Sequence, residues 1–176
     1  MMSAVRSDNV PNLVTVQYTS AWKVWNVLLV PSFFFTATVI EKRKPLSSTA
    51  QRAGWVGCNI LLKQIPTDGK LRVVADGIAA PVHRIRNQFD QIRPLSRLAV
   101  GLRGWTLDVL NAVRQIQKQE FTLSDVYVFE TQLAAAHPGN RNVREKIRQQ
   151  LQRLRDLGFL QFISPGHYHA LMSEGE

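Results

Sequence analysis

Hydrophobic and polar residues alternate along the first part of the chain in a way that predicts short strands. Residues Leu13–Thr19 alternate in character, and Trp25–Val30 forms a second extended run. We expect both strands to be fully or half buried. Thr67–Lys70 predicts a turn, with a strand over Leu71–Ala75 behind it. The apolar stretch Cys58–Ile65 fits a helix and a strand equally well.

Further along, the pattern changes from strands to helices. Residues 76–103 are rich in arginine with scattered apolar positions, and we expect them to connect two domains. Thr106 is a candidate N-cap of a helix. The apolar positions of this helix recur at helical spacing: Leu107, Leu110, Val113 and Ile116. A second helix is expected from Thr122 to His137, because Thr122 and Asp125 have the spacing of a capping box.

A third helix is expected over Asn142–Leu157, with Glu145 at its capping-box position and Gly158 after its C-terminus. Its inner stripe is apolar: Val143, Ile147, Leu151 and Leu154. Two extended pieces follow, Phe159–Ile163 and Tyr168–Leu171, joined by a Pro-Gly turn. Three helices followed by a hairpin predict a winged helix. The chain is therefore expected to be α+β, with an N-terminal part over residues 1–100 and a winged-helix DNA-binding domain over residues 103–172.

Composition adds a preference for a polyanionic partner. The 176 residues carry a net charge of +9, and arginine, which dominates the excess, makes bidentate contacts with phosphate and guanine. This favours nucleic acid over a bland basic surface. The single cysteine, Cys58, excludes an internal disulfide and a cysteine zinc cluster, and we expect it to be a small buried thiol. A reduced, cytoplasmic setting fits, since neither a leader nor a membrane-spanning run is evident.

The outer side of the third predicted helix carries the candidate DNA-reading residues. In helix-turn-helix folds this helix enters the major groove, where Arg pairs with guanine and Asn or Gln with adenine. Any helix can instead carry a solvated basic face, but the position of this one favours groove reading. His167 in the hairpin turn is a weaker candidate, which could contact DNA or simply close the turn. The set is Arg141, Asn142, Arg144, Arg148, Gln149, Gln152 and His167.

Hydrolysis of DNA would require two acids that hold a divalent metal and a lysine near them. Among the 13 acidic residues, only Asp68-Gly69-Lys70 has the Asp-x-Lys ending of such a site. It falls in a predicted tight turn, where Asp and Gly are expected for backbone reasons. No group of histidines or acids has metal-ligand spacing, so we assign neither a catalytic residue nor a metal ligand.

A second conspicuous segment is Thr49–Ile60, in which two glycines flank Trp55 and Arg52 precedes it. A tryptophan held on a tight backbone can present its face or edge to a ligand, such as a methyl group on a base. The alternative is a core tryptophan with glycines that allow close packing. The residues alone favour this core alternative.

Blocks of this sequence resemble the DpnI-type, Dam-replacing restriction endonucleases from about residue 5 to residue 169. These blocks are Arg43–Leu46, Thr49-Ala50, Arg52–Trp55, Gly57–Ile60, Arg103–Thr106, Glu120–Leu123, Glu145–Gln152 and Leu154–Asp156. The resemblance implies a PD-(D/E)xK nuclease domain followed by a winged helix, and cleavage of G-A-T-C only where adenine is N6-methylated. It also implies that Trp55 contacts the adenine methyl groups, which reverses the core interpretation, and that Arg52 lies at the DNA. The hairpin turn Ser164–His167 is less basic than in the family.

The resemblance also implies that the family's catalytic acids, lysine and four-cysteine zinc site lie upstream of the matching part. We therefore expect the C-terminal half of a nuclease domain with the winged helix, without the Mg²⁺ and structural Zn²⁺ sites and so without a cofactor. Three hypotheses stay open. The chain is a DNA-binding fragment, a complete endonuclease whose true start lies upstream, or a stand-alone winged-helix regulator. The expected partner is methylated duplex DNA rather than a membrane, bound by a monomer.

Overall fold

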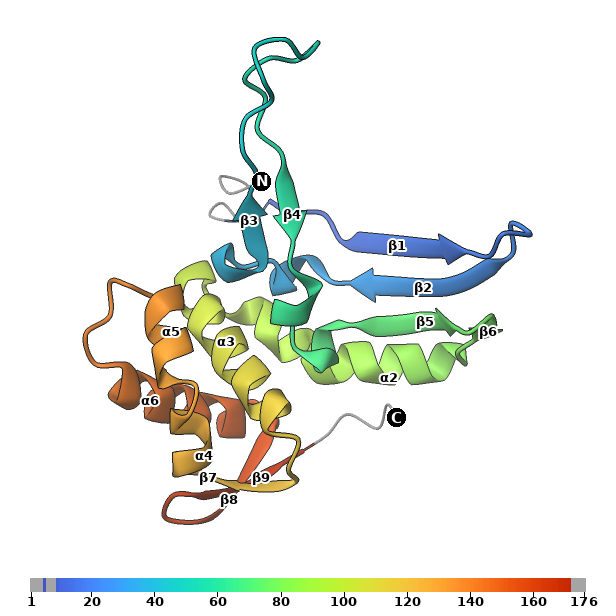
Figure 1. The fold of residues 1–176 in the computed structure, drawn as a ribbon. Helices are drawn as coiled ribbons and strands as arrows, with labels where there is room; N and C mark the ends of the chain where they lie inside the picture. The colour runs from blue at the N-terminus through green and yellow to red at the C-terminus, as the bar shows by residue number, and fades with distance from the viewer. Residues whose placement is uncertain (1–4, 6–8, 172–176) are drawn as a thin grey trace.

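The computed structural model describes Val5 and residues 9–171 as an α+β molecule, with a sheet in its N-terminal part and helices in its C-terminal part (Figure 1). This confirms the predicted fold class. The outer ends of the two predicted domains, residues 1–4 and residue 172, lie outside the described residues. No helix in the described part is long and apolar enough to cross a membrane.

Four antiparallel strands form the main sheet in the order β1-β2-β5-β6. Their bounds are Leu13–Tyr18 (β1), Val24–Val30 (β2), Leu71–Ala75 (β5) and Ile78–Ala79 (β6). The three predicted strands are therefore confirmed. Strand β1 is half buried, which lies within the expectation, and its exposed face carries Val14, Val16 and Tyr18. Successive side chains of a strand point to opposite faces, and Leu13 on the other face packs against the core.

Residues 76–103 form regular structure where we expected only a connection. They contain helix α2 (Val82–Ile92), the 3-10 turn η5 (Arg93–Arg97) and the start of helix α3 (Val100–Ile116). Helix α2 runs along β5 (Figure 1). Ile85 and Ile92, seven positions apart, lie on its inner side, while its two arginines, Arg84 and Arg86, are exposed. The remaining 3-10 turns are η1 (Ser32–Phe34), η2 (Ala37–Val39), η3 (Leu62–Gln64) and η4 (Thr67–Gly69).

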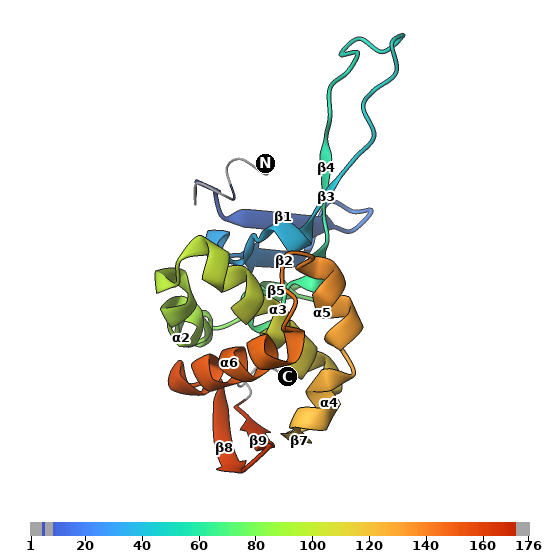
Figure 2. The same ribbon diagram turned by 90° about the vertical axis from the view of Figure 1, so that its left-hand side faces the viewer.

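Strands β3 (Ile40–Lys42) and β4 (Cys58–Ile60) form a separate antiparallel pair. Residues 43–57, which join them and are called the arm below, project away from the body in both views (Figures 1 and 2). The stretch after residue 58 is thus a short strand followed by turn η3. Cys58 is exposed, so its expected place as a buried thiol is wrong. It lies at the base of the arm, outside the core.

The C-terminal part has the order of a winged helix, as predicted. Its helices are α3, the pair α4 (Leu123–Tyr127) and α5 (Glu130–Ala136), and α6 (Val143–Asp156). Its sheet has the strand order β7-β9-β8, with bounds Glu120–Thr122 (β7), Leu160–Ser164 (β8) and His167–Ala170 (β9). The predicted hairpin is present, and β7 adds a third strand to it. The single second helix that we expected is divided into α4 and α5.

The two predicted N-caps of the first helices differ in outcome. Thr122 caps α4 in a reciprocal capping box with Asp125, as expected. Thr106 is no cap, because α3 already begins at Val100. The Thr106 hydroxyl is buried and donates to Gln150 Oε1 of α6 at 2.8 Å, so this threonine joins two helices instead of starting one.

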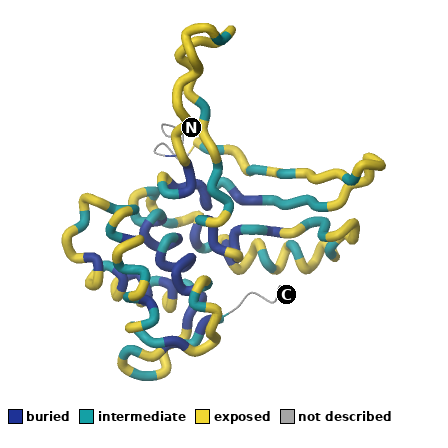
Figure 3. Tube along the Cα trace, in the orientation of Figure 1, coloured by how far each residue is buried: buried dark blue, intermediate teal, exposed yellow. Residues whose placement is uncertain are grey.

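One hydrophobic cluster runs through both parts of the molecule (Figure 3). Two polar contacts cross the junction beside it. Arg114 of α3 donates to Asp68 of η4 through Nε (2.9 Å) and Nη2 (2.7 Å), and Nη2 also donates to the Leu171 carbonyl (2.9 Å). Asp108 of α3 accepts from Thr38 (2.8 Å) and contacts His137 (2.7 Å). Buried bidentate pairs have a fixed geometry, so these contacts hold the two parts as one packed body.

Candidate nucleic-acid interface

Helix α6 buries its inner stripe and leaves a continuous polar side uncovered. Ile147, Leu151 and Leu154 are fully buried and Val143 nearly so, as predicted. The opposite side, called the outer face of α6 below, is exposed along its length. It includes Arg144, Arg148, Gln149 and Gln152 of the helix, Arg141 and Asn142 just before it, and the acid Glu145 among them. The fold therefore brings six of the predicted DNA-reading residues together along one side of α6 and its N-terminus.

The N-terminus of α6 is built differently from the predicted capping box. Asn142 is the N-cap residue, but among the described residues its side chain makes no capping hydrogen bond. Its backbone N–H instead donates to Asn140 Oδ1 at 2.8 Å. Glu145 contacts Arg148 rather than the N-cap backbone. The predicted capping box is therefore wrong. Because the Asn142 side chain makes no capping hydrogen bond, it stays exposed on the outer face.

Two arginines of the outer face are held by groups from α4 and α5. The guanidinium carbon of Arg144 lies 4.9 Å from the centroid of the Tyr127 ring, and its Nε donates to Glu130 at 2.8 Å. Arg148 donates to the Tyr127 hydroxyl at 3.0 Å and to Glu145 at 3.1 Å. The hydrogen bond and the charge of Glu130 raise the pKa of Arg144. Both guanidinium groups thus have fixed neighbours before any ligand arrives.

Tyr127 and Glu130 were not identified from the sequence. Tyr127 ends α4 and Glu130 begins α5, and neither element has a helical period long enough to show which side faces α6. Their contacts with Arg144 are tertiary, over 14 or more positions of sequence. Local patterns do not contain this information.

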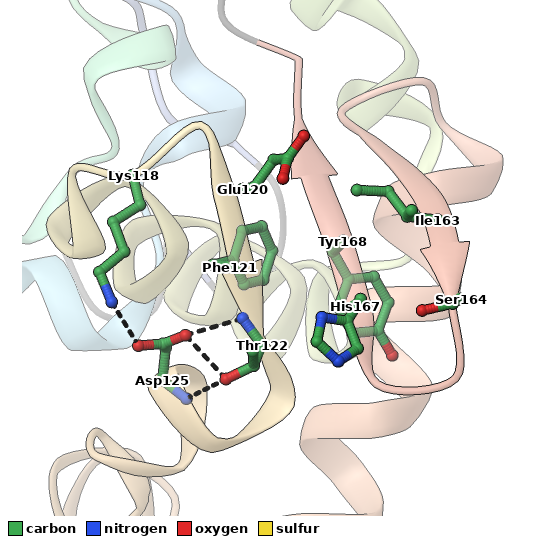
Figure 4. A pocket seen from close by; sticks show the side chains of 9 residues that line it. All are labelled: Lys118, Glu120, Phe121, Thr122, Asp125, Ile163, Ser164, His167 and Tyr168. Carbon is green, nitrogen blue, oxygen red and sulfur yellow. Dashed lines mark hydrogen bonds and ion pairs between the residues drawn. The ribbon is translucent and has the colours of Figure 1, made fainter.

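Strands β8 and β9 form a hairpin, called the wing hairpin below. His167 is the first residue of β9 and is exposed. Beside it lies a recess of about 330 Å³ between the β7 end and β8–β9 (Figure 4). It is lined by Lys118, Glu120, Phe121, Thr122, Asp125, Ile163, Ser164, His167 and Tyr168. Lys118 donates to Asp125 at 2.8 Å, and Glu120 brings a second acid. The mixed charge makes this recess a poor anion site.

The arm is a hairpin that extends the β3–β4 ladder. The amide of Arg43 donates to the Gly57 carbonyl at 3.0 Å, and that of Leu46 donates to the Trp55 carbonyl at 2.9 Å. Gly54 has φ +78°, a left-handed conformation in which glycine is unstrained. These bonds give the arm a defined backbone, although most of its residues are exposed (Figure 3).

Trp55 lies on this arm and is 53% exposed. A Cβ atom at Gly57 would lie 2.9 Å from two atoms of the indole, so the ring rests against the glycine backbone. Glycine is therefore required at position 57 for the indole to lie flat. The core position that the residues alone favoured is wrong, and the indole keeps about half of its surface for another contact.

The arm is strongly cationic. Arg43, Lys44 and Arg52 are exposed, and the arm contains no acidic residue. Of these, sequence reasoning selected only Arg52. Arg43 and Lys44 could have been selected as well, because with Lys42 they form a run of three basic residues. In both views the arm and the wing hairpin lie at opposite ends of the molecule (Figures 1 and 2), so the arm residues and His167 do not form one cluster.

The described residues do not fit a metal centre. Within residues 5 and 9–171, no three His, Cys, Asp or Glu side chains are placed to hold a metal ion. Asp68, the acid of the Asp-x-Lys sequence, is buried in turn η4 and engaged by Arg114. The predicted turn is confirmed, and Asp68 has a packing role there. We derive no metal-dependent step from these residues.

Two family models match this chain, one over its N-terminal part and one over its C-terminal part. A family model described as the DpnI Dam-replacing family matches residues 1–98, and one described as the Dam-replacing HTH domain of DpnI-type proteins matches residues 101–170. The first match alone covers more than half of the chain. The chain belongs to the Dam-replacing family.

The two family matches cover both the arm and the outer face of α6. The arm lies within the match to the nuclease-like region, and α6 lies within the match to the helix-turn-helix domain. This member of the family is therefore a restriction-type DNA-binding protein. In helix-turn-helix domains in general, the exposed side of the recognition helix contacts the major groove.

Proposed function

We propose that this chain binds duplex DNA at G-A-T-C sites that carry N6-methyladenine. The observation that carries the proposal is the half-exposed indole of Trp55 on an arm that is cationic and well ordered by backbone hydrogen bonds. The arm presents this apolar face, and the outer face of α6 presents donors and acceptors for base edges. Membership of the Dam-replacing family supports DNA binding by this chain.

In this proposal Trp55 distinguishes a methylated adenine by burying its methyl group. Burial of one methyl-sized group is worth about 0.8 kcal/mol, which corresponds to about fourfold in affinity. An unmethylated amino group offers the indole no such gain. The preference for methylated DNA is therefore expected to be modest per methyl group and to rise when both strands are methylated.

The test is to titrate the protein into the unmethylated, hemimethylated and fully methylated forms of one duplex and to measure binding by fluorescence anisotropy. We expect affinity to rise about fourfold for each methyl group that becomes fully buried. Trp55→Ala is expected to remove this preference. Trp22→Ala is the matched control, because Trp22 is 83% exposed but lies in the β1–β2 turn. Equal affinity of the unmodified protein for all three duplexes would refute methyl reading.

We further propose that binding occurs without hydrolysis by this chain alone. This is supported by the engagement of Asp68 with Arg114 at 2.7 Å, which removes from the surface the acid of the Asp-x-Lys sequence. Incubation of the methylated duplex with the protein and Mg²⁺ is expected to leave the DNA intact. Magnesium-dependent cutting of the methylated duplex would contradict this part of the proposal.

A further inference from the structure

Tyr127 contacts two exposed arginines of α6, Arg144 and Arg148, at once. Its ring lies beneath the Arg144 guanidinium, 4.9 Å from centroid to Cζ, and its hydroxyl accepts from Arg148 Nη1 at 3.0 Å. The aromatic body of Tyr127 packs against the hydrophobic core. A single anchored side chain from α4 therefore supports two cations that are four positions apart on α6.

The same two arginines also contact carboxylates, but these contacts are of a different kind. Glu130 is bonded to Arg144 and Glu145 to Arg148, and the side chains in both pairs are between 35% and 63% exposed. Exposed ion pairs contribute little net free energy. A guanine or a phosphate can therefore replace either carboxylate at small cost. The Tyr127 ring is neutral and lies on the guanidinium face, so it need not leave when the guanidinium edge bonds to DNA.

An arginine that reads guanine gains from being fixed in advance. The long side chain loses rotamer freedom when it is immobilised, and bidentate contact with guanine requires one orientation of the guanidinium plane. Arg144 and Arg148 are also like charges at i,i+4 spacing, which favours divergent rotamers. Support from Tyr127 reduces the cost of ordering before the DNA is bound.

We propose that Tyr127 is a positioning residue that sets the orientation of Arg144 and Arg148 and so determines how well α6 discriminates bases. The inference rests on the proposed DNA-binding function. It concerns discrimination between duplexes rather than total affinity, since Tyr127 is placed to hold the arginines and contributes no charge of its own.

Two substitutions separate the ring from the hydroxyl. Tyr127→Phe keeps the ring under Arg144 and removes the acceptor for Arg148. Tyr127→Leu keeps an apolar side chain against the core and removes both contacts. Tyr18→Phe is the matched control, because Tyr18 is an exposed tyrosine in β1, away from α6.

The experiment measures binding to the methylated G-A-T-C duplex and to a duplex in which A·T replaces each G·C pair of the site. We expect the affinity ratio to fall roughly threefold in Tyr127→Phe and roughly tenfold in Tyr127→Leu, as a partial loss of one bidentate base contact. The dependence of affinity on salt is expected to stay unchanged, because no cation is removed. Tyr18→Phe should keep the ratio of the unmodified protein.

An unchanged affinity ratio in Tyr127→Leu would overturn the inference, whether both affinities stay the same or both fall equally, as a packing role alone would cause. A second readout needs no DNA. Rotation about the Nε–Cζ bond of Arg144 and Arg148, measured by NMR, is expected to be slow in the unmodified protein and faster in Tyr127→Leu. Equal rotation rates would overturn the inference as well. If the unmodified protein bound no duplex at all, the proposed function itself would fail, which is a distinct result.

Discussion

Several neighbouring groups stabilise the charge of Asp125 at the start of α4. It accepts a hydrogen bond from Lys118 and two from Thr122, through its backbone amide and its hydroxyl. Lys118 first, and then Thr122, hold the pKa of this carboxyl well below its usual range. A carboxyl whose pKa is lowered in the folded state stabilises the protein above its unfolded pKa, near 3.9, and the contribution is lost as the pH falls below that value.

Replacing Asp125 by Ala is expected to lower the Tm at pH 7 by roughly 2–4 °C, because a helix cap contributes about 1 kcal/mol. The difference from the unmodified protein should begin to narrow as the pH falls below about 4, and it should go on narrowing at lower pH because the folded pKa lies far below that value. Thermal unfolding followed by circular dichroism at several pH values measures both effects. Asp90→Ala, which removes only an exposed ion pair with Arg93, should change little. A Tm difference that stays constant with pH would show that the pKa of Asp125 is not lowered in the folded protein.

Trp55 shows why single residues are hard to interpret from sequence. Glycines beside a tryptophan indicate close approach of the backbone, and the structure confirms this contact at Gly57. The same contact occurs in cores and on projecting arms, so the local pattern does not fix exposure. What decides it is the distance of the arm from the body of the molecule (Figure 1), and that depends on the entire fold.

At the scale of elements, sequence patterns predict best where period and caps agree. The strand over residues 71–75 and helix α6 were predicted nearly to their bounds. Helix α2 was missed because its arginines outweighed a short apolar stripe. The start of α3 was placed too late, since Gly101 and Gly104 lower the helix propensity of its first turns. Packing on α6 and on the core overrides that propensity.

The arm supports a prediction of its own. Replacing Arg43, Lys44 and Arg52 together by Gln should flatten the dependence of log Kobs on log salt by about 2–3, because each phosphate contact contributes about 0.9 to the slope for duplex DNA. The measurement is a salt titration of binding to the methylated duplex.

The control for the arm removes three other exposed arginines, Arg84, Arg86 and Arg97, which lie on α2 and η5. It lowers the net charge by the same amount, so a general electrostatic effect would flatten both slopes equally. A specific phosphate grip by the arm would flatten only the first. Equal slopes in the two triple variants would therefore argue against the arm as a DNA contact.

At the scale of the whole molecule, the Asp68–Arg114 pair fixes the sheet-containing part against the winged helix. Both side chains are at most 5% exposed. Asp68→Ala is expected to lower the free energy of unfolding by roughly 3–5 kcal/mol, because it removes the carboxylate from a buried guanidinium. Urea denaturation measures this. The double variant Asp68→Leu, Arg114→Met should lose much less, since no buried charge is left without its counterion.

A loss below about 1 kcal/mol in Asp68→Ala would indicate that water reaches Arg114 and that the junction is loose. A double variant as unstable as the single one would point instead to the other contacts of Arg114, among them its hydrogen bond to the Leu171 carbonyl. The two outcomes therefore separate the ion pair from the remaining contacts of Arg114. Neither contact was predictable from sequence, because Asp68 and Arg114 are brought together only by the packing of η4 on α3.

The Arg114 contacts have a practical consequence for dissecting the protein. A winged helix excised at the limits of its family match, residues 101–170, would retain Arg114 but leave behind both Asp68 and the Leu171 carbonyl. The Arg114 guanidinium, which is buried in the intact chain, would then be exposed to solvent in the module. An added exposed cation strengthens sequence-independent attraction to phosphates. The affinity of the module for any DNA is therefore expected to rise, and its preference for one sequence to fall. Recognition measured on such a piece would describe the cut surface as much as the protein.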